Sequence, residues 1–196
     1  MTAPRLIAGL GNPGPEHAND RHNAGFWFVD ELARTHGIAM RREAKFFGEL
    51  GKGRIGGHDC WLLKPLGYMN RSGQAVGAVA NFYRIAPAEI LVAYDELDLA
   101  PGTARLKLGG SSTHNGLRDI TARLAGPGYW RLRFGIGHPR DIHPGKPVAD
   151  FVLGAPSREH RGAIEAAIER AVSVTPMIAA DDYPGATRIL HTVPDS

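Results

Sequence analysis

The polar residues best suited to chemistry follow short apolar runs at several places in the chain. Asn12 and His22 come after the run "LIAGL", and Asp95 closes the run "ILVAYD". Two further segments, "LGYMN" and "GGSSTHNG", contribute Met69, Asn70, His114 and Asn115. In open α/β sheets a site forms beyond the carboxyl ends of the strands, so we expect these side chains to meet there.

These side chains favour direct attack by water over covalent catalysis. A histidine such as His22, with a usual pKa of about 6.5, suits a general base, and the carboxylate of Asp95 on its other nitrogen would fix the tautomer. The chain has no GxSxG motif, and Cys60 lies in an apolar run that would raise the pKa of its thiol. The amide of Asn12 could align water or stabilise an oxyanion. The predicted substrate is therefore an activated acyl bond such as an ester.

Each of these residues also has a purely structural interpretation. Asn12 could adopt left-handed backbone in a turn, and Asp95 could belong to a solvated turn. Asn115 could be the N-cap of the helix that follows it, and Met69 could fill a core. His22, in a polar loop, could simply be exposed.

A glycine-rich turn, "GLGNPGPEHANDRHNAG" from Gly9 to Gly25, raises the question of nucleotide binding. A dinucleotide turn needs a helix to begin at once and an acidic residue about 20 positions further on at the end of a second strand. Here helical periodicity starts only at Phe26, and the acidic residues at that distance lie inside the helix. The pattern therefore disfavours NAD.

The nine histidines form no pattern typical of a metal site. There is no HExxH motif, and His138 and His143 flank "PRDI" in a proline-containing loop, which is a weak arrangement. We therefore expect no metal site.

Apolar runs typical of strands alternate along the chain with helical patterns. The strand runs are "RLIAGL", "CWLLKP", "ILVAYDE" and "RLRFGIG". Helices are predicted over 24–35 and from about residues 72, 115 and 157. The segments "GELGKGRI" and "HDCWLL", separated by Gly56 and Gly57, predict an antiparallel hairpin. The pattern indicates one α/β domain, residues 1–196, with a central twisted mixed, mainly parallel sheet flanked by helices.

Several segments lack a regular pattern. Stretches 11–23, 108–114 and 138–145 are long for a compact domain, where such loops usually carry function. The tail, residues 181–196, has little apolar periodicity, and we expect it either to be flexible or to lie over the body of the domain.

The composition fits a cytoplasmic protein, and its charges are unevenly distributed along the chain. It has one cysteine, no signal-peptide core and no apolar run long enough to span a membrane. Residues 41–84 carry eight basic and three acidic side chains, residues 102–148 eight and two, and the remaining C-terminal segment four and seven. One positive face would suit nucleic acid, although an ordinary solvated surface is the alternative.

Four ordered motifs, taken together, closely resemble the bacterial-type peptidyl-tRNA hydrolases. They are the Gly9–Gly25 turn, "KPLGYMNRSGQAV", "YDELDLAPGTARLKLGGSSTHNGLRDI", and "RLRFGIGHP" with the later "VADFVLG". The resemblance implies a monomeric α/β domain with a mixed sheet that hydrolyses the ester between a peptide and the 3′ end of tRNA, without metal or cofactor. It implies that His22 is the base paired with Asp95 and that Asn12 is catalytic with them. We expect the substrate-binding residues to be His17, Met69, Asn70, His114 and Asn115.

The chain departs from the family pattern at a few positions. His17 stands where the family usually has tyrosine, Asp20 where it usually has threonine, and "GGSSTHNG" where it usually has "GGGHGGHNG". These departures bear on contacts near the tRNA end and on the mobility of the loop before His114.

Two other functions stay open beside the enzyme. A pure RNA-binding module would use the basic middle of the chain without needing the histidine, carboxylate and asparagine set, and a nucleotide-dependent enzyme would use the Gly9 turn. If the substrate is tRNA, candidates for phosphate contacts are Lys107, Arg118 and Arg133.

Overall fold

The computed structural model describes residues 2–192, and its strands form one seven-stranded sheet. The strands are β1 (Leu6–Gly9), β2 (Arg41–Glu43), β3 (Gly48–Ile55), β4 (His58–Pro65), β5 (Ile90–Glu96), β6 (Ala104–Leu108) and β7 (Trp130–Gly135). Their order across the sheet is β2-β3-β4-β1-β5-β7-β6. β4, β1, β5 and β7 pair in parallel, whereas every pairing of β2, β3 or β6 is antiparallel. The predicted mixed, mainly parallel sheet is confirmed.

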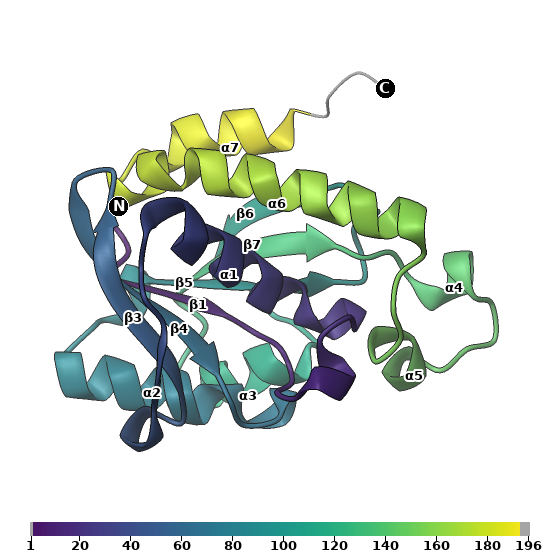
Figure 1. The fold of residues 1–196 in the computed structure, drawn as a ribbon, viewed down its shortest axis with the longest axis horizontal. Coiled ribbons are helices and arrows are strands. Elements are labelled where there is room, and N and C mark those ends of the chain that lie inside the picture. Colours follow the sequence, from purple (N-terminus) through teal and green to yellow (C-terminus); the bar gives the residue numbers. More distant parts are fainter. Residues whose placement is uncertain (1, 193–196) are drawn as a thin grey trace.

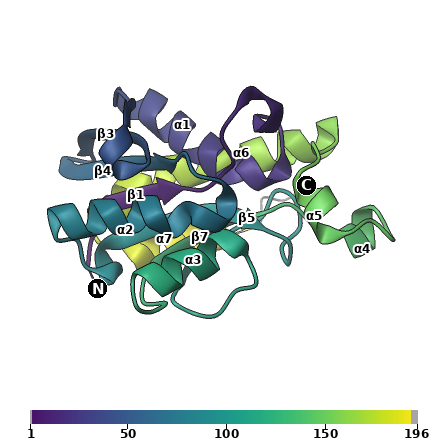
Figure 2. The same cartoon turned by 90° about the horizontal axis from the view of Figure 1, so that it is seen from below.

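Helices cover both faces of this sheet. α1 (Ala24–His36), α6 (Arg158–Ala179) and α7 (Tyr183–His191) lie on one side, and α2 (Ser72–Tyr83) and α3 (Asn115–Arg123) on the other (Figure 1). Figure 2, seen from below, shows α2 and α3 side by side in front of the strands. An apolar core lies on each side of the sheet, one with α1 and α6 and the other with α2 and α3. Because side chains alternate along a strand, Leu91 of β5 belongs to the former core and Val92 to the latter.

The helices that the sequence predicts are present at nearly the predicted bounds. α1 ends at Gly37, which adopts the left-handed conformation (φ 64°) that glycine takes without strain. α6 begins after Ser157, whose hydroxyl accepts a hydrogen bond from the backbone nitrogen of His160. Within residues 2–192, no helix, α6 included, has the length and apolar character needed to cross a membrane.

The two edge strands and several short helices were not predicted. β2 is three residues long and wholly exposed, and β6 alternates polar with apolar residues, because edge strands face solvent and need no apolar run. The loop 11–23 contains two single 3-10 turns, η1 (Pro15–His17) and η2 (Arg21–Asn23). The stretch 138–145, expected to be irregular, contains the short helix α4 (Pro139–Ile142), and α5 (Val148–Val152) follows it at the same end of the molecule (Figure 1).

The C-terminal segment lies over the body of the domain in its described part. Tyr183, Ala186 and Leu190 of α7 are buried, and the ring of Tyr183 stacks on Trp130 with centroids 3.8 Å apart. The alternative of a flexible tail is therefore wrong for 183–191, because three apolar side chains at helical spacing anchor this helix. Residues 193–196 lie outside the described residues.

The glycines of the first turn permit close packing between α1 and the sheet. A Cβ atom at Gly9 would clash with the carbonyl oxygen of Gly25, and one at Gly25 would clash with Ala93 and Leu10. α1 begins only at Ala24, well after the turn. The glycines thus bring the start of α1, and the loop before it, against the ends of β1 and β5.

Candidate active site

A cavity of about 560 Å³ opens beside the carboxyl end of β5, where the sequence predicts a site. It is lined by η2, the end of β5 with the turn after it, the loop before α3, and α5. Of the predicted site residues, those that line it are His22, Asp95, Lys107, His114, Asn115 and Arg133. Those that do not are Asn12, His17, Met69, Asn70 and Arg118.

His22 is carried by η2, directly before α1. Its side chain is largely buried, and its Nδ1 lies 2.7 Å from Oδ2 of Asp95. The ring nevertheless lines the cavity, and within residues 2–192 its Nε2 makes no hydrogen bond. The interpretation of His22 as a simply exposed loop residue is therefore wrong, because the loop folds back onto the end of β5.

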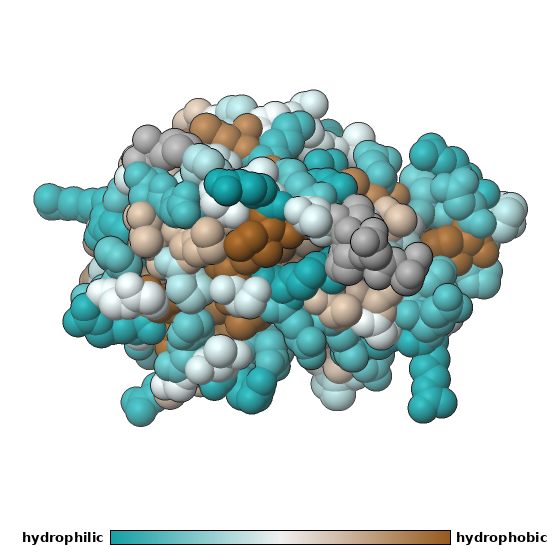
Figure 3. All heavy atoms as spheres, turned by 90° about the horizontal axis from the view of Figure 1, so that it is seen from above, coloured by the Kyte–Doolittle hydropathy of each residue, from teal (hydrophilic) through white to brown (hydrophobic). Residues whose placement is uncertain are grey.

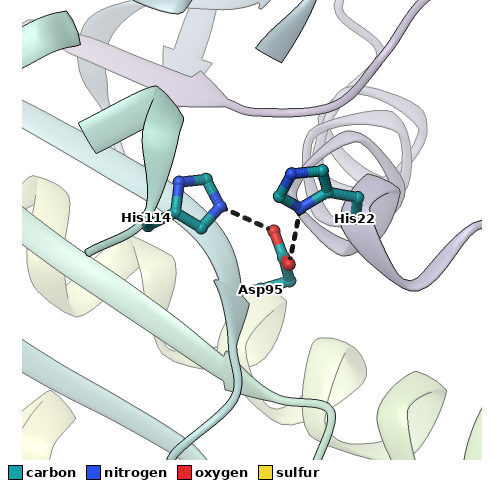
Figure 4. Close-up of side chains that lie close together, drawn as sticks. All are labelled: His22, Asp95 and His114. Carbon is teal, nitrogen blue, oxygen red and sulfur yellow. Dashed lines mark hydrogen bonds and ion pairs between the residues drawn. The ribbon is translucent and has the colours of Figure 1, made fainter. Parts of the chain in front are cut away.

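Asp95 lies near the end of β5, a central strand, and its side chain is only 1% exposed. Its two carboxylate oxygens accept hydrogen bonds from two different imidazoles (Figure 4). Oδ2 binds His22, and Oδ1 lies 2.9 Å from Nε2 of His114. A buried carboxylate needs such donors to offset the loss of water, so the solvated-turn interpretation of Asp95 is wrong as well.

His114 is the N-cap of α3, and this role fixes its tautomer. Its Nδ1 accepts hydrogen bonds from the backbone nitrogens of Gly116 (3.1 Å) and Leu117 (3.4 Å). A ring nitrogen that accepts carries no proton, so the hydrogen-bond network assigns the proton to Nε2, which donates to Asp95. The prediction of Asn115 as the N-cap is therefore wrong, because the preceding imidazole takes that position and Asn115 becomes the first residue of the helix.

The electrostatics of the site favour a charged Asp95 and a readily protonated His22. Burial alone lowers the pKa of His22, but the charge and hydrogen bond of Asp95 and the charge of Asp20 together raise it above its usual value of 6.5. Burial would raise the pKa of Asp95, but the two imidazoles outweigh it and hold that pKa well below its usual range. The pair can therefore store a proton on the imidazole.

The same three residues also offer ligand atoms for a metal ion. One atom from each of His22, Asp95 and His114 lies within 4.8 Å of the others, and imidazole and carboxylate are common zinc ligands. However, the separations of 2.7 and 2.9 Å are those of N–H···O bonds. A metal would have to replace the proton on each of these nitrogens. The geometry therefore fits a proton-bridged trio better than a metal centre.

Asn12 does not line the cavity but holds neighbouring segments in place through hydrogen bonds. Its Oδ1 accepts a hydrogen bond of 2.7 Å from the backbone nitrogen of Met69. Its backbone exchanges two hydrogen bonds with the side-chain amide of Asn23, a residue that sequence reasoning missed. The amide oxygen of Asn12 is thus occupied, while within residues 2–192 its Nδ2 makes no hydrogen bond.

Met69 and Asn70 lie in one 3-10 turn, η4 (Met69–Arg71), but point into different surroundings. Met69 is buried in the core beneath α3, where its sulfur would meet any side chain added at Gly116. Asn70 is exposed. The core-filling interpretation of Met69 therefore holds for its side chain, while its backbone is held by the amide of Asn12.

The two departures from the family pattern in the first loop contact each other. Nδ1 of His17 lies 2.7 Å from Oδ2 of Asp20, and the carboxyl group of Asp20 is buried. The structure thus brings both substituted residues into one pair next to η2, outside the cavity lining.

The basic residues predicted for phosphate contacts differ in whether they line the cavity and whether they are paired with a carboxylate. Lys107 at the end of β6 is exposed and lines the cavity. Arg133 of β7 also lines it, but its guanidinium lies 3.0 Å from the carboxylate of Glu96. Arg118 is exposed on α3, away from the lining.

One wall of the cavity consists of residues to which the sequence analysis gave no role. Val148, Ala149 and Val152 of α5 line the cavity. Their positions i, i+1 and i+4 lie near one face of a helix, which is the signal that could have identified them in "VADFV".

The sequence is similar to those of known proteins over almost its whole length. A sequence model of the family described as Peptidyl-tRNA hydrolase matches residues 6–194. The peptidyl-tRNA hydrolase of Bordetella parapertussis is 54% identical over 188 residues, covering 95% of this chain and 87% of that protein. The one from Bordetella petrii is 53% identical over 192 residues, covering 97% of this chain and 91% of that protein.

A solved structure agrees over the same extent. The crystal structure of peptidyl-tRNA hydrolase from Acinetobacter baumannii matches with a TM-score of 0.93 and 46% identity, covering 98% of this chain and 97% of that one. The shared sequence, the shared fold and the imidazole–carboxylate geometry lead to one conclusion. This chain belongs to the peptidyl-tRNA hydrolase family.

Proposed function

We propose that this protein hydrolyses the ester between a peptide and the 3′ end of tRNA, with water as the nucleophile and His22 as general base. The hydrogen bond from Nδ1 of His22 to Asp95 carries the proposal, because it leaves Nε2 unprotonated toward the cavity. Nε2 takes a proton from water as the oxygen attacks the ester carbonyl, and Asp95 stabilises the imidazolium that forms. The imidazolium then returns the proton to the leaving ribose oxygen.

Stabilisation of the oxyanion falls to Asn115. It lines the cavity as the first residue of α3, where its amide and the positive end of the helix both favour developing negative charge. Asn12 and Asn70 do not contact the oxyanion in this proposal. Asn12 fixes the backbone of Met69, and Asn70 presents an exposed amide to the substrate.

Substrate selection rests on neutral amides and on basic residues at the cavity rim. Lys107, which makes no ion pair within residues 2–192, is the better candidate for a phosphate contact, and Arg133 contributes while paired to Glu96. Loss of one phosphate contact reduces the salt slope of binding by about one. Arg118 would contact tRNA only if the duplex extends over α3.

The asparagine amides also suggest selection for the first peptide bond. We expect N-blocked aminoacyl esters of tRNA to react much faster than those with a free α-amino group, because an ammonium ion cannot replace an amide carbonyl as a hydrogen-bond acceptor. Release rates on N-acetylated and free aminoacyl-tRNA measure this. Equal rates would contradict it.

We also propose that the protein acts as a cytoplasmic monomer without metal or cofactor. The face over α6 and α7, seen from above in Figure 3, is mainly hydrophilic around a central apolar area. A mainly hydrophilic face favours a monomer on this side of the molecule. In the site, proton transfer between His22 and water needs no metal.

The decisive experiment measures peptide release from purified peptidyl-tRNA by the wild type and His22→Asn, with and without a chelator. We expect kcat to fall roughly 10²–10⁴-fold in the variant with tRNA binding preserved, and the chelator to have no effect. Unchanged turnover in the variant would remove His22 from the mechanism. If the wild type binds tRNA without releasing peptide, the RNA-binding module applies instead.

A further inference from the structure

Arg21, the residue before His22, ties the catalytic loop to α5. Its side chain is buried, and its guanidinium carbon lies 3.9 Å from the centre of the Phe151 ring. Nη1 donates a hydrogen bond of 2.9 Å to the carbonyl oxygen of Phe151, and the backbone nitrogen of Arg21 donates one of 3.0 Å to Gly154. One residue thus holds the ring, the carbonyl and the turn that ends α5.

These contacts matter because α5 is a wall of the cavity. Val148, Ala149 and Val152 line the same space as His22. α5 has only five residues, and a helix of that length is not stable through its own hydrogen bonds. Its place beside His22 therefore depends on side-chain anchors, and the side chain of Arg21 provides two of them, the contact with the Phe151 ring and the hydrogen bond of Nη1.

The chemistry of Arg21 argues for a geometric role. Burial lowers the pKa of its guanidinium, and none of the ion pairs within residues 2–192 includes it. Its Nε is buried and has no hydrogen-bond partner among residues 2–192. A neutral apolar residue would avoid this cost. The planar guanidinium stacks on the Phe151 ring while it donates to the carbonyl of the same residue, which the ammonium of a lysine cannot reproduce with the same geometry.

We propose that Arg21 is a positioning residue that fixes α5 against the loop of His22 and so sets where the ester lies relative to the base. This inference rests on the proposed function for the role of His22. It assigns Arg21 no contact with substrate. Its effect reaches the reaction through the wall formed by Val148, Ala149 and Val152.

The test compares Arg21→Met and Arg21→Lys with Arg170→Met. Arg170 is a matched control, because its Nη2 donates to the carbonyl oxygen of Gly102 and its Nε has no partner in the described part of the chain. It lies on α6, outside the cavity. We expect Arg21→Met to lower kcat/KM on peptidyl-tRNA by roughly 100-fold, since a misplacement of about 1 Å can cost that much. Arg21→Lys should recover part of this loss, and Arg170→Met should leave kcat/KM of the folded protein unchanged.

Two readouts separate positioning from a general loss of stability. Amide hydrogen exchange should rise in residues 148–154 of Arg21→Met but not in α6. The acid limb of the kcat/KM profile should keep its pKa, because the bond between His22 and Asp95 is intact. If Arg21→Met does not fold, Phe151→Leu, which removes the ring and keeps the carbonyl, should give the same pattern more weakly.

A fall in kcat/KM of less than about twofold, exchange that rises equally throughout the chain, or an equal loss in Arg170→Met overturns the proposal. Failure of the proposed function is recognised separately. If His22→Asn retains full turnover, the base assignment fails, and the exchange of residues 148–154 still decides whether Arg21 anchors α5.

Discussion

Asp95 accepts a hydrogen bond from each of two imidazoles, yet only one imidazole has a nitrogen left for catalysis. Nδ1 of His114 is occupied by the backbone of α3, whereas His22 lines the cavity and its Nε2 makes no hydrogen bond among residues 2–192. The division of roles between the two histidines therefore follows from their second nitrogen atoms. His22 can accept a proton, and His114 can only donate to the carboxylate.

The raised pKa of His22 predicts the pH dependence of activity. Only the neutral imidazole can act as a base, so kcat/KM should fall as the pH drops through a value above the usual 6.5. In Asp95→Asn the negative charge that raises this pKa is lost and one of the two acceptor oxygens becomes an NH2 group, while burial still lowers the pKa. The acid limb should therefore move to lower pH while kcat falls, which pH profiles of both proteins measure. An unmoved limb would mean that another group controls it.

The contribution of His22 to the free energy of unfolding should change with pH in the direction opposite to activity. A folded-state pKa above the unfolded value means that His22 adds stability below pH 6.5, and that this is lost as the pH rises through the folded value. For Asp95 the pKa is depressed, so its contribution is present above its usual 3.8 and lost as the pH falls through the folded value. Activity thus rises with pH over the range where the contribution of His22 is lost.

At the scale of elements, the first turn of α3 serves both the helix and the site. The side chain of His114 caps the helix with Nδ1 and holds Asp95 with Nε2. Gly116 leaves room for this imidazole, because an added Cβ there would meet Met69 and the imidazole itself. A single imidazole therefore couples the start of a helix to the end of the central strand β5.

Two variants of His114 should separate these roles. Asn is a good N-cap but too short to replace the bond to Asp95, whereas Ala supplies neither contact. We expect His114→Ala to be less stable than His114→Asn by about 1 kcal/mol in urea unfolding. Both should lose roughly tenfold in kcat, equivalent to about 1.4 kcal/mol. Full activity in His114→Asn would show that the bond to Asp95 is dispensable.

At the scale of the whole molecule, the C-terminal helix α7 packs on the sheet outside the active-site cavity. α7 lies beside α6 and against β6 (Figure 1), and Tyr183 stacks on Trp130. None of its residues lines the active-site cavity. Its contribution to the protein is therefore expected in stability rather than in kcat.

Tyr183→Ala tests that expectation. Removing a buried aromatic side chain should cost about 3 kcal/mol and lower Tm by roughly 6–12 °C for a chain of this size. Below the new transition kcat should be that of the wild type. A large loss of kcat in the folded variant would show that α7 acts on the site.

How far the sequence predicts the structure depends on how much of each element is buried. β1 and β5 are buried on both faces and appear as unbroken apolar runs, so they could be predicted with their order in the chain. β2 and β6 lie at sheet edges, and α5 is a single short turn of helix, so none of them has a strong periodic pattern. The loop of His22 looked exposed because its burial comes from segments far away in the chain.

The sequence by itself determined the family, the class of fold and the residues able to do chemistry, because residue types and short spacings are properties of the chain alone. Only the tertiary structure decided which histidine has a free nitrogen, that Asn12 braces Met69, and that α5 forms a wall. These facts depend on contacts such as that between His22 and Asp95, which are 73 positions apart. Such contacts arise when burial of two apolar cores brings the strand ends and loops together, and no local pattern encodes them.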